Sequence, residues 1–400
     1  MTCRLCKTQN TVDVIDLGNQ FITSRFPVYG DITTPSTPVC LILCSDCGLV
    51  QLKESVSSNE LYEHSYGYRS GINGMMMKHL QDYNSEIQNK IVLHPGDSVL
   101  DIGSNDATFL KYYPNTLSRV GCDPTGKQFA KYYEDVTLVP TYFNANAVSH
   151  LGVKFKVVSS ISMFYDLPDP IQFAKDVYSV LDDEGIWTLE QSYIVTMLER
   201  NSIDTICHEH IEYYSLTQIK QIMDAAGFKI IDVSQNECNG GSFRIYVAKR
   251  SSSHLEAIEI VNQMLDNECS LDLKSPNTYR EFLERCDNEI SKLKNFLKEH
   301  TNTYIYGAST KGNCLLQYAD ITEKDIHYAV ERNLDKVGKM TCTGIEIISE
   351  ETMRSNPPEC LLVLPWHFKE DIIKREHEYL KNGGTLLFPF PKFEVVKHAI

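Results

Sequence analysis

Ser98-Val-Leu-Asp-Ile-Gly-Ser-Asn-Asp106 decides the fold of this chain. The run from Ser98 to Ile102 is apolar and short, which predicts a buried strand, and Gly103 opens the loop after it. A glycine directly after a parallel strand lets the backbone approach a ligand closely, and ligands bind at that carboxyl end of the sheet. Residues 107–113 then predict the start of a helix. The stretch therefore predicts the first strand and turn of a ligand-binding α/β sheet.

Further strands are predicted downstream of this turn. About twenty residues on, the strand 119–123 ends in Asp123, where an acid can accept hydrogen bonds from both ribose hydroxyls. Apolar runs follow at 136–139, 155–160 and 185–190. Strands that alternate with helices in this way favour a parallel α/β sheet. A dinucleotide site would need G-x-G-x-x-G, and the loop after Gly103 lacks the second and third glycines, which disfavours NAD.

The D-x-G-x-N/D pattern together with Asp123 resembles the class I S-adenosylmethionine (SAM) methyltransferases. That resemblance implies a cofactor site at the carboxyl ends of the strands. It places Asp101 and Gly103 beside the methionine part and Asp123 at the ribose, and it makes Asn105 a further cofactor-binding residue. The remaining residues that it implies are Tyr142, Phe143 and Asn144 near the adenine, and Ser160, which ends the fourth strand and faces cofactor and substrate.

A second cluster, Cys207-His-Glu-His210, carries two histidines around one glutamate. Zinc proteases need histidines at i and i+4 of a helix, so this spacing is wrong for them. In an extended segment, His208 and His210 point to opposite faces, and one can face a substrate while the other supports it. A neutral histidine beside a carboxylate is suited to taking an acidic proton near neutral pH. The alternative for either histidine is a hydrogen-bonded loop residue. The helix expected from Leu216 is capped by Ser215 or Thr217.

Two C-x-x-C pairs near the N-terminus predict a structural zinc site with four ligands: Cys3, Cys6, Cys44 and Cys47. Each pair can form a turn that presents two thiolates, and two turns complete a tetrahedral shell. Four protein ligands leave no open position, so the metal is expected to be structural. Cys40 is not assigned as a ligand. The alternative is a set of four reduced thiols.

The C-terminal third predicts helices and then a second α/β region. Helical spacing covers 255–298, and Thr303 to Asn313 again reads as strand, glycine loop and helix. Such a loop offers backbone amides to an anion, and Lys311 adds charge. The spacing differs from that of a P-loop, which lowers the odds of an NTPase. The turn at Asn239 and Gly240 is either an ordinary hairpin or a loop that faces substrate.

Taken in order, these motifs resemble the sugar C-methyltransferases that branch deoxysugars at C3. The matching set is the four cysteines with 48–51, Tyr66 to Gly71, Asp101 to Asp106, His208 to His210 with Tyr214 and Ser215, 240–242, 306–308 with Lys311, and Arg332, Asn333, Lys336 and Gly338. The resemblance implies that His210 is the base, with Glu209 and His208 beside it, and that Tyr66 or Tyr68 faces the sugar. It also implies that Lys311, Arg332, Lys336 and the Asn239–Gly240 turn help to bind a nucleotide-linked 4-keto-deoxysugar. The chain departs from some relatives at Cys207 and Asp166.

These inferences give one expected architecture. Residues 1–65 form a zinc-binding domain, 66–250 a class I SAM methyltransferase domain of Rossmann-like α/β fold, 251–298 a helical linker, and 299–400 a C-terminal Rossmann-like α/β domain that helps to bind the nucleotide sugar. The nucleotide, the sugar and the product's stereochemistry stay open.

Composition limits the other classes of function. The net charge of −15 disfavours nucleic acid as a partner, and no apolar run approaches the length of about 18 residues that a membrane span needs. The N-terminal residues lack the apolar core of a signal peptide, and the 13 mostly scattered cysteines favour a reducing cytoplasm. The oligomeric state is open and compatible with a monomer. The alternatives are a SAM-dependent O- or C-methyltransferase acting on another small molecule, and a non-enzymatic zinc-bearing binding protein.

Overall fold

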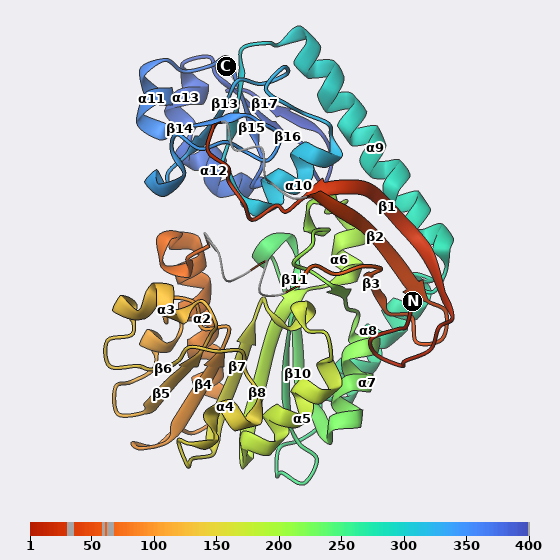
Figure 1. Cartoon of the computed structure of the whole chain (residues 1–400), viewed down its shortest axis with the longest axis vertical. Helices are drawn as coiled ribbons and strands as arrows, with labels where there is room; N and C mark the ends of the chain where they lie inside the picture. The colour runs from red at the N-terminus through yellow and green to blue at the C-terminus, as the bar shows by residue number, and fades with distance from the viewer. Residues whose placement is uncertain (30–35, 58–60, 62–67, 399–400) are drawn as a thin grey trace.

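Three sheets organise the chain in the computed structural model, which describes residues 1–29, 36–57, 61 and 68–398 (Figure 1). We call them the head sheet, with strand order β1-β2-β3-β9, the middle sheet, with order β10-β11-β8-β7-β4-β5-β6, and the C-terminal sheet, with order β14-β13-β12-β15-β16-β17. Tyr66, one of the residues predicted to face the substrate, lies outside the described residues.

The head sheet is antiparallel and takes its last strand from the middle of the chain. Its first three strands are β1 (Thr11–Phe21), β2 (Ser36–Cys44) and β3 (Val50–Leu52). The fourth is β9 (Glu212–Tyr213), which follows the histidine cluster and pairs with β3 through Val50 and Gln51. The head is therefore joined to that cluster by backbone hydrogen bonds.

The middle sheet has the predicted parallel α/β core. Its strands are β4 (Ser98–Ile102), β5 (Ser118–Cys122), β6 (Thr137–Val139), β7 (Phe155–Ile161), β8 (Leu181–Ser192), β10 (Phe228–Asn236) and β11 (Ser242–Lys249). Strands β4 to β8 run parallel, and β11 is antiparallel to both of its neighbours. The chain leaves β4 towards β5 and β6 and then returns to place β7 on the other side of β4. In open α/β sheets such a reversal of strand order marks the crevice where ligands bind.

The helices that belong to this sheet are α2 (Gly74–Lys90), α3 (Gly126–Phe129), α4 (Ala145–Ser149), α5 (Pro170–Val180), α6 (Ile194–Glu199) and α7 (Leu216–Ala226). Helix α7 begins as predicted: Ser215 is its N-cap, with Gln218 completing a capping box, and Gly227 ends it in the left-handed region. The helix expected over 107–113 was wrong. Only the 3-10 turn Leu110–Tyr112 forms there, because the following Pro114 restricts Tyr113 to extended backbone.

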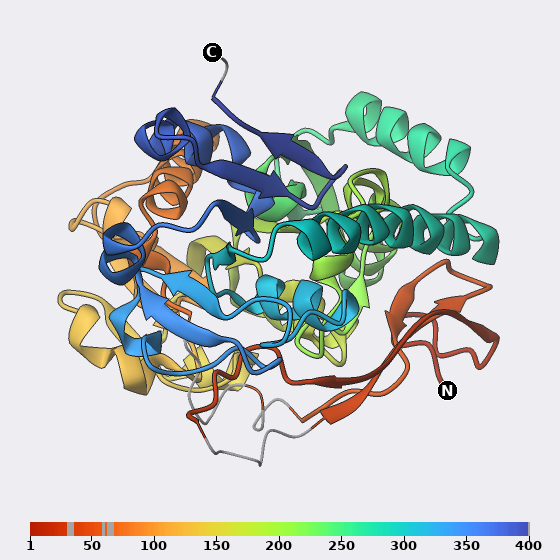
Figure 2. The ribbon, with the colours of Figure 1, turned by 90° about the horizontal axis from the view of Figure 1, so that it is seen from above.

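Two helices lead from the middle sheet to the C-terminal sheet, α8 (Ile258–Ser270) and α9 (Pro276–Glu299). The sheet consists of β12 (Thr303–Tyr306), β13 (Tyr328–Glu331), β14 (Glu346–Ser349), β15 (Cys360–Val363), β16 (Thr385–Phe388) and the antiparallel β17 (Glu394–Val396). Its helices are α10 (Thr310–Tyr318), α11 (Glu350–Ser355), α12 (Lys369–Arg375) and α13 (His377–Lys381). Seen from above, α9 runs along one side of the molecule, between α8 and the C-terminal sheet (Figure 2). Strand order reverses between β12 and β15, which marks a second candidate crevice.

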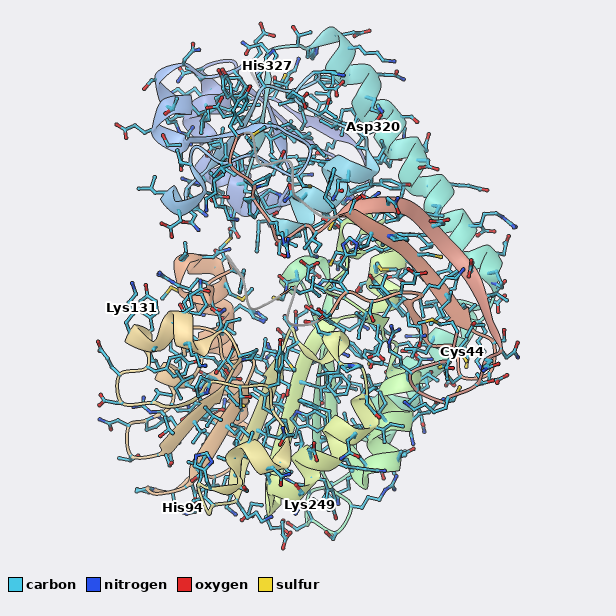
Figure 3. All side chains as sticks on the ribbon, viewed as in Figure 1. Cys44, His94, Lys131, Lys249, Asp320 and His327 are labelled. Atoms are coloured by element: carbon cyan, nitrogen blue, oxygen red, sulfur yellow. The ribbon has the colours of Figure 1, made fainter. Side chains whose placement is uncertain are left out.

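The carboxyl ends of the middle strands face the C-terminal sheet. His94, which precedes β4, and Lys249, which ends the antiparallel β11, both lie at the far end of the middle sheet (Figure 3). Cys44 lies in the head, at the side of the molecule. Both crevices therefore open towards the space between the two sheets. Among the described residues, no helix combines the length and the apolar character that a membrane span requires.

Candidate active site

The histidine cluster lies where the three sheets meet. It follows the 3-10 turn Ile203–Thr205 and runs directly into β9 of the head sheet. The Leu52 amide donates to the Ile211 carbonyl at 2.9 Å, and the Arg4 guanidinium donates to the Leu52 carbonyl at 2.8 Å. These backbone contacts fix the loop that carries His210 relative to the head.

The two histidines face different parts of the protein, although residues 207–209 form bends and the segment is not a strand. Nε2 of His208 lies 3.2 Å from the Thr37 carbonyl in the head, and this side chain is buried. Nδ1 of His210 lies 2.7 Å from the Thr205 carbonyl, and its ring centroid lies 4.3 Å from that of Tyr165, which follows β7. Only His210 therefore points towards the carboxyl ends of the middle strands.

The Thr205 contact fixes which nitrogen of His210 can act as a base. A carbonyl oxygen only accepts hydrogen bonds, so Nδ1 must carry the hydrogen, and in the neutral ring the free lone pair is on Nε2. Burial opposes protonation, but the neighbouring Cys207, the Thr205 carbonyl and Glu209 outweigh it and raise the pKa of His210 above its usual value. Strong proton affinity on a defined atom is the property that a general base needs.

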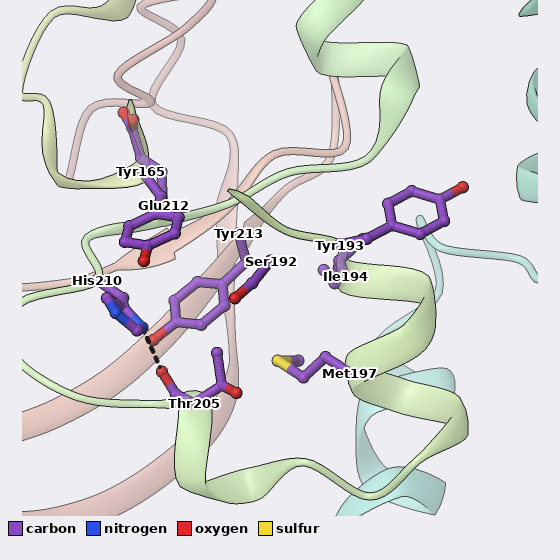
Figure 4. Close-up of a pocket in the computed structure, with 9 residues that line it drawn as sticks. All are labelled: Tyr165, Ser192, Tyr193, Ile194, Met197, Thr205, His210, Glu212 and Tyr213. Carbon is purple, nitrogen blue, oxygen red and sulfur yellow. Dashed lines mark hydrogen bonds between the residues drawn. The ribbon is translucent and has the colours of Figure 1, made fainter. Parts of the chain in front are cut away.

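His210 lines a small cavity at the end of β8 (Figure 4). Its volume of about 10 Å³ has room for roughly one water molecule. The lining residues are Tyr165, Ser192, Tyr193, Ile194, Met197, Thr205, His210, Glu212 and Tyr213.

Polar atoms without partners concentrate around this cavity. Buried polar groups are normally hydrogen-bonded, so each exception needs an explanation. Within the described residues, some of the buried polar atoms that lack a partner fall in one short stretch, on Ser202, Asp204, Glu209, Glu212 and Tyr213, and Glu212 and Tyr213 line the cavity. That clustering favours a functional site over a packed loop.

Glu209 acts on His210 through its charge, and its carboxylate makes its hydrogen bond elsewhere. Its carboxylate accepts a hydrogen bond from the Thr23 hydroxyl at 3.2 Å, and the Thr23 carbonyl accepts from the Asn313 side chain at 2.8 Å. Glu209 therefore connects the catalytic loop to the head and to α10. A positioning role fits these contacts.

The predicted cofactor residues meet at the first crevice. Asp123 is buried at the end of β5, where its carboxylate accepts from the Asn105 amide at 2.8 Å and from the Thr125 amide at 2.6 Å. Asp101 accepts from Ser159 at 2.6 Å, and burial raises its pKa to about 7 despite that bond. A buried carboxylate of this kind is stabilised by a cation, and the methionine part of SAM carries two.

The loop after β4 requires a glycine at its first position. Gly103 has φ of +78°, and a Cβ there would come within 3.0 Å of Met163. Asn105 holds the segment before α2, because its side chain donates to the Tyr68 carbonyl at 3.1 Å and accepts from the Ser70 amide at 3.0 Å. Asp101, Gly103, Asn105 and Asp123 thus surround one place, which fits SAM.

The other predicted cofactor residues have different surroundings. Ser160 is fully buried, and its hydroxyl accepts from the Trp187 indole at 3.2 Å, so Ser159 and not Ser160 contacts Asp101. Phe143 packs against Phe173, and Asn144 caps α4. Tyr142 is partly exposed.

A cleft of about 240 Å³ lies at the second crevice, between the two larger sheets. Tyr68 lines it from the middle part, and Phe26 lines it from the chain that follows β1. The C-terminal part contributes the glycine loop 306–310, Glu331 to Asn333, and Lys336. Arg332 and Lys336 are thus placed where a bound anion would lie.

Lys311 lies elsewhere. Its ammonium donates to the Asn239 carbonyl and lies 3.3 Å from the Thr205 hydroxyl. Asn239 in turn lies 3.3 Å from the Ser162 hydroxyl, and Gly240 lies beside Trp366. The β10–β11 connection is a hairpin, and its turn connects the C-terminal part to the catalytic loop. Lys311 therefore supports the residue whose carbonyl orients His210.

Sequence reasoning missed several residues of the cavity. Tyr165 and Thr205 contact His210, and Trp366 donates to Asp204 at 2.9 Å from the C-terminal part. Tyr213 also lines the cavity.

The four predicted zinc ligands are together in the head. Their sulfur atoms all lie within 4.8 Å of one another, with 3.6 Å between Cys3 and Cys47 and 3.5 Å between Cys6 and Cys44. A tetrahedral shell with Zn–S bonds of about 2.3 Å puts sulfur atoms at about this separation. The residues present therefore fit zinc.

Three family models match successive parts of the chain. "Putative zinc binding domain" matches residues 3–62, "Methyltransferase domain" matches 76–233, and "C-methyltransferase C-terminal domain" matches 237–391. Their order follows that of the head, middle and C-terminal parts.

Two curated proteins are similar in sequence. The C-methyltransferase NovU of Streptomyces niveus is 28% identical over 98% of this chain and 96% of its own length. A tRNA U34 carboxymethyltransferase of Campylobacter lari is 27% identical over 29% of this chain and 40% of its own length.

The two solved structures that follow each match less than half of this chain. The plantazolicin methyltransferase BpumL, in complex with a desmethyl analogue and SAH, has a TM-score of 0.36 and 12% identity, covering 45% of this chain and 87% of that one. The magnesium protoporphyrin IX methyltransferase of Synechocystis, with bound SAM, has a TM-score of 0.34 and 12% identity. The match covers 43% of this chain and 79% of that one.

The family model for the N-terminal part agrees with the four clustered thiols of the head. The cofactor is SAM and the metal of the head is zinc. In the order of its three parts, this chain is similar to C-methyltransferases that carry an N-terminal zinc-binding domain.

Proposed function

We propose that the protein methylates C3 of a nucleotide-linked 4-keto-deoxysugar, with His210 as the general base. The observation that carries this proposal is the fixed tautomer of His210: Thr205 holds the hydrogen on Nδ1, so the basic lone pair is on Nε2, and the ring lines a cavity at the end of β8. A ketone at C4 makes the neighbouring C3–H acidic, and this is the kind of proton that a histidine can remove.

The chain's own residues account for the proton transfer. His210 takes the C3 proton on Nε2, the C–H electron pair becomes the C3–C4 double bond of an enolate, and the ketone oxygen takes the negative charge. When bound, SAM supplies an electrophilic methyl group that ends on C3. Thr205 and Lys311 keep the imidazole of His210 in position, and this lowers the entropic cost of reaching the reactive geometry.

The cleft between the sheets supports a nucleotide-linked substrate. Burial lowers the pKa of Lys336, its ammonium donates to the Ala308 carbonyl at 2.7 Å, and it lies 4.0 Å over the Phe26 ring. No described carboxylate forms an ion pair with it. A buried cation beside a glycine loop is suited to bind a diphosphate. These contacts support a nucleotide end that binds in the cleft.

The direct test combines the purified protein, SAM and freshly prepared 4-keto-6-deoxy sugars linked to thymidine, guanosine or cytidine diphosphate. We expect mass spectrometry to show one product that gains a single methyl group, and NMR to locate that group on C3. Methylation on oxygen would contradict the carbon specificity. Transfer to none of these sugars, with SAM bound in the same sample, would contradict the substrate class.

Lys336→Ala is expected to raise KM for the nucleotide sugar about 10- to 100-fold, because one charge-assisted hydrogen bond contributes about 1.5–3 kcal/mol. SAM affinity should stay unchanged. Lys324→Ala is the matched control, because Lys324 is exposed in the same part of the chain and does not line the cleft. An unchanged KM in Lys336→Ala would remove the diphosphate from this end of the cleft.

Asp123→Ala is expected to weaken SAM binding about 10- to 100-fold, since it removes a carboxylate that can accept from the ribose hydroxyls. Isothermal titration with SAM measures the effect. Asp123→Asn keeps an oxygen for the Asn105 and Thr125 amides and should show a smaller loss. Glu134→Ala, which removes an exposed carboxylate nearby, serves as the control. Equal affinities in all of these variants would mean that the cofactor lies elsewhere.

A further inference from the structure

One titratable group at the His210 cavity has no part in the mechanism so far. Tyr213 is 5% exposed, and its hydroxyl has no hydrogen-bond partner among the described residues. Leaving a buried hydroxyl without a partner costs free energy, so a native structure that keeps one has a use for it.

The position of Tyr213 is fixed by backbone pairing. Tyr213 lies in β9 opposite Val50 of the head sheet, so its ring projects from a paired strand and not from a free loop. In Figure 4 its hydroxyl points towards His210 and the Thr205 carbonyl, from the side of the cavity next to the imidazole. A substrate atom in this cavity would lie between a base and a phenol.

The phenol keeps its hydrogen under ordinary conditions and can donate it to a ligand. Burial raises the pKa of Tyr213 well above its ordinary value, and the nearby Cys207 amide only partly offsets this. The hydroxyl therefore stays protonated while His210 takes up a proton. One small cavity thus combines an acceptor on Nε2 with a hydrogen that has no other acceptor among the described residues.

Other hydroxyls around the cavity are already engaged. The Tyr193 hydroxyl donates to Glu268 at 2.8 Å, and the Thr205 hydroxyl lies 3.3 Å from the Lys311 ammonium. Tyr165 also lines the cavity and already interacts with other residues, which leaves Ser192, at the end of β8, as the other candidate. It is shorter and partly exposed, so a bound substrate oxygen has more to gain from Tyr213.

We propose that Tyr213 is a catalytic residue that donates a hydrogen bond to the ketone oxygen of the substrate as negative charge develops there. This rests on the proposed function. His210 removes the C3 proton, the C–H electron pair moves into the C3–C4 bond, and the carbonyl π pair moves onto the oxygen that faces Tyr213. When C3 takes the methyl group, the ketone re-forms and Tyr213 keeps its proton.

Tyr213→Phe tests this directly, because it keeps the ring and removes only the hydroxyl. Removing one preorganised donor of this kind lowers kcat about 10²- to 10³-fold. We expect the same loss in the rate at which the substrate's C3 hydrogen exchanges with deuterated water when SAH replaces SAM. The SAM dissociation constant should stay within about twofold of the wild-type value, and Tm should be unchanged or higher, because the lost hydroxyl had no described partner.

Tyr246→Phe is the matched control, since Tyr246 is also buried, also has a hydroxyl without a described partner, and lies on β11 away from the cavity. Ser192→Ala measures the competing donor. A Tyr213→Phe enzyme with wild-type kcat and exchange, or one that loses Tm but not rate, would overturn the proposal and leave the proposed function intact. A wild-type enzyme that methylates none of the 4-keto sugars would overturn both.

Discussion

His210→Asn is expected to lower kcat for methyl transfer about 10²- to 10⁴-fold, the range that general base catalysis contributes. Asparagine retains a polar group near the Thr205 carbonyl but has no basic nitrogen. The cofactor residues Asp101 and Asp123 lie on other strands, so SAM affinity should not change. Initial rates together with a SAM titration separate the two effects.

His150→Asn is the control, because it removes an exposed imidazole from the same part of the chain. Deuterium exchange at the substrate's C3 adds a second measurement, because it reports proton removal independently of methyl transfer. This exchange should stop in His210→Asn. Exchange at the wild-type rate in His210→Asn would mean that another group removes the proton.

The pH dependence of the wild-type enzyme should follow His210. A base works only when it is neutral, so kcat/KM is full above the pKa of His210 and is lost as the pH falls through it. Because the surroundings raise this pKa, the acid limb should lie above about 6.5, the ordinary value for histidine. The same limb should be absent from whatever residual activity His210→Asn retains.

Cys44→Ser is expected to abolish zinc binding and with it most of the activity. Structural zinc contributes about 10–16 kcal/mol of binding free energy in small domains, so the head should lose its fold. Strand β3 follows directly after the second pair of cysteines, and it holds β9 and the loop of His210. The Gln218 side chain also donates to the Cys47 carbonyl at 2.9 Å, so α7 loses a contact.

Metal content and Tm check the loss of zinc and of the head's fold, and kcat measured together with SAM affinity checks the effect on activity. We expect zinc to be lost, Tm to fall, and kcat to drop at least as far as in a general-base variant, about 10²-fold, while SAM still binds. Cys40→Ser is the matched control, because Cys40 is buried in β2 and lies outside the four-sulfur cluster. Full activity in zinc-free Cys44→Ser would show that the head does not position His210.

The sequence was sufficient for the parts of the fold that local pattern determines. Apolar runs before Gly103 and Gly307 predicted strands of parallel sheets, and the two cysteine pairs predicted a cluster that the structure places together. It was not sufficient where distant segments meet. The pairing of β9 with the head needs Val50 and Tyr213 to come together, and no local pattern predicts such a contact.

The candidate site divides in the same way. The i, i+2 spacing predicted that His208 and His210 face different sides, because alternation is a property of extended backbone. Lys311 looked like an anion ligand because it follows a glycine loop, yet it donates to Asn239 and supports Thr205, since the two sheets approach each other there. Which cationic side chains remain available to a ligand depends on how the middle and C-terminal sheets pack, and this packing cannot be predicted from local sequence.

The origin of β9 limits how this protein can be cut or recombined. A truncated protein that starts after the head would leave β9 as an uncovered edge next to the histidine loop, and exposed edges invite pairing with other chains. A head taken from a relative would have to pair with β9 of this chain, which is not the fourth strand of its own sheet. Chimeras should therefore exchange residues 1–57 together with 202–218, two pieces that are far apart in the gene and form one cooperative unit in the folded chain.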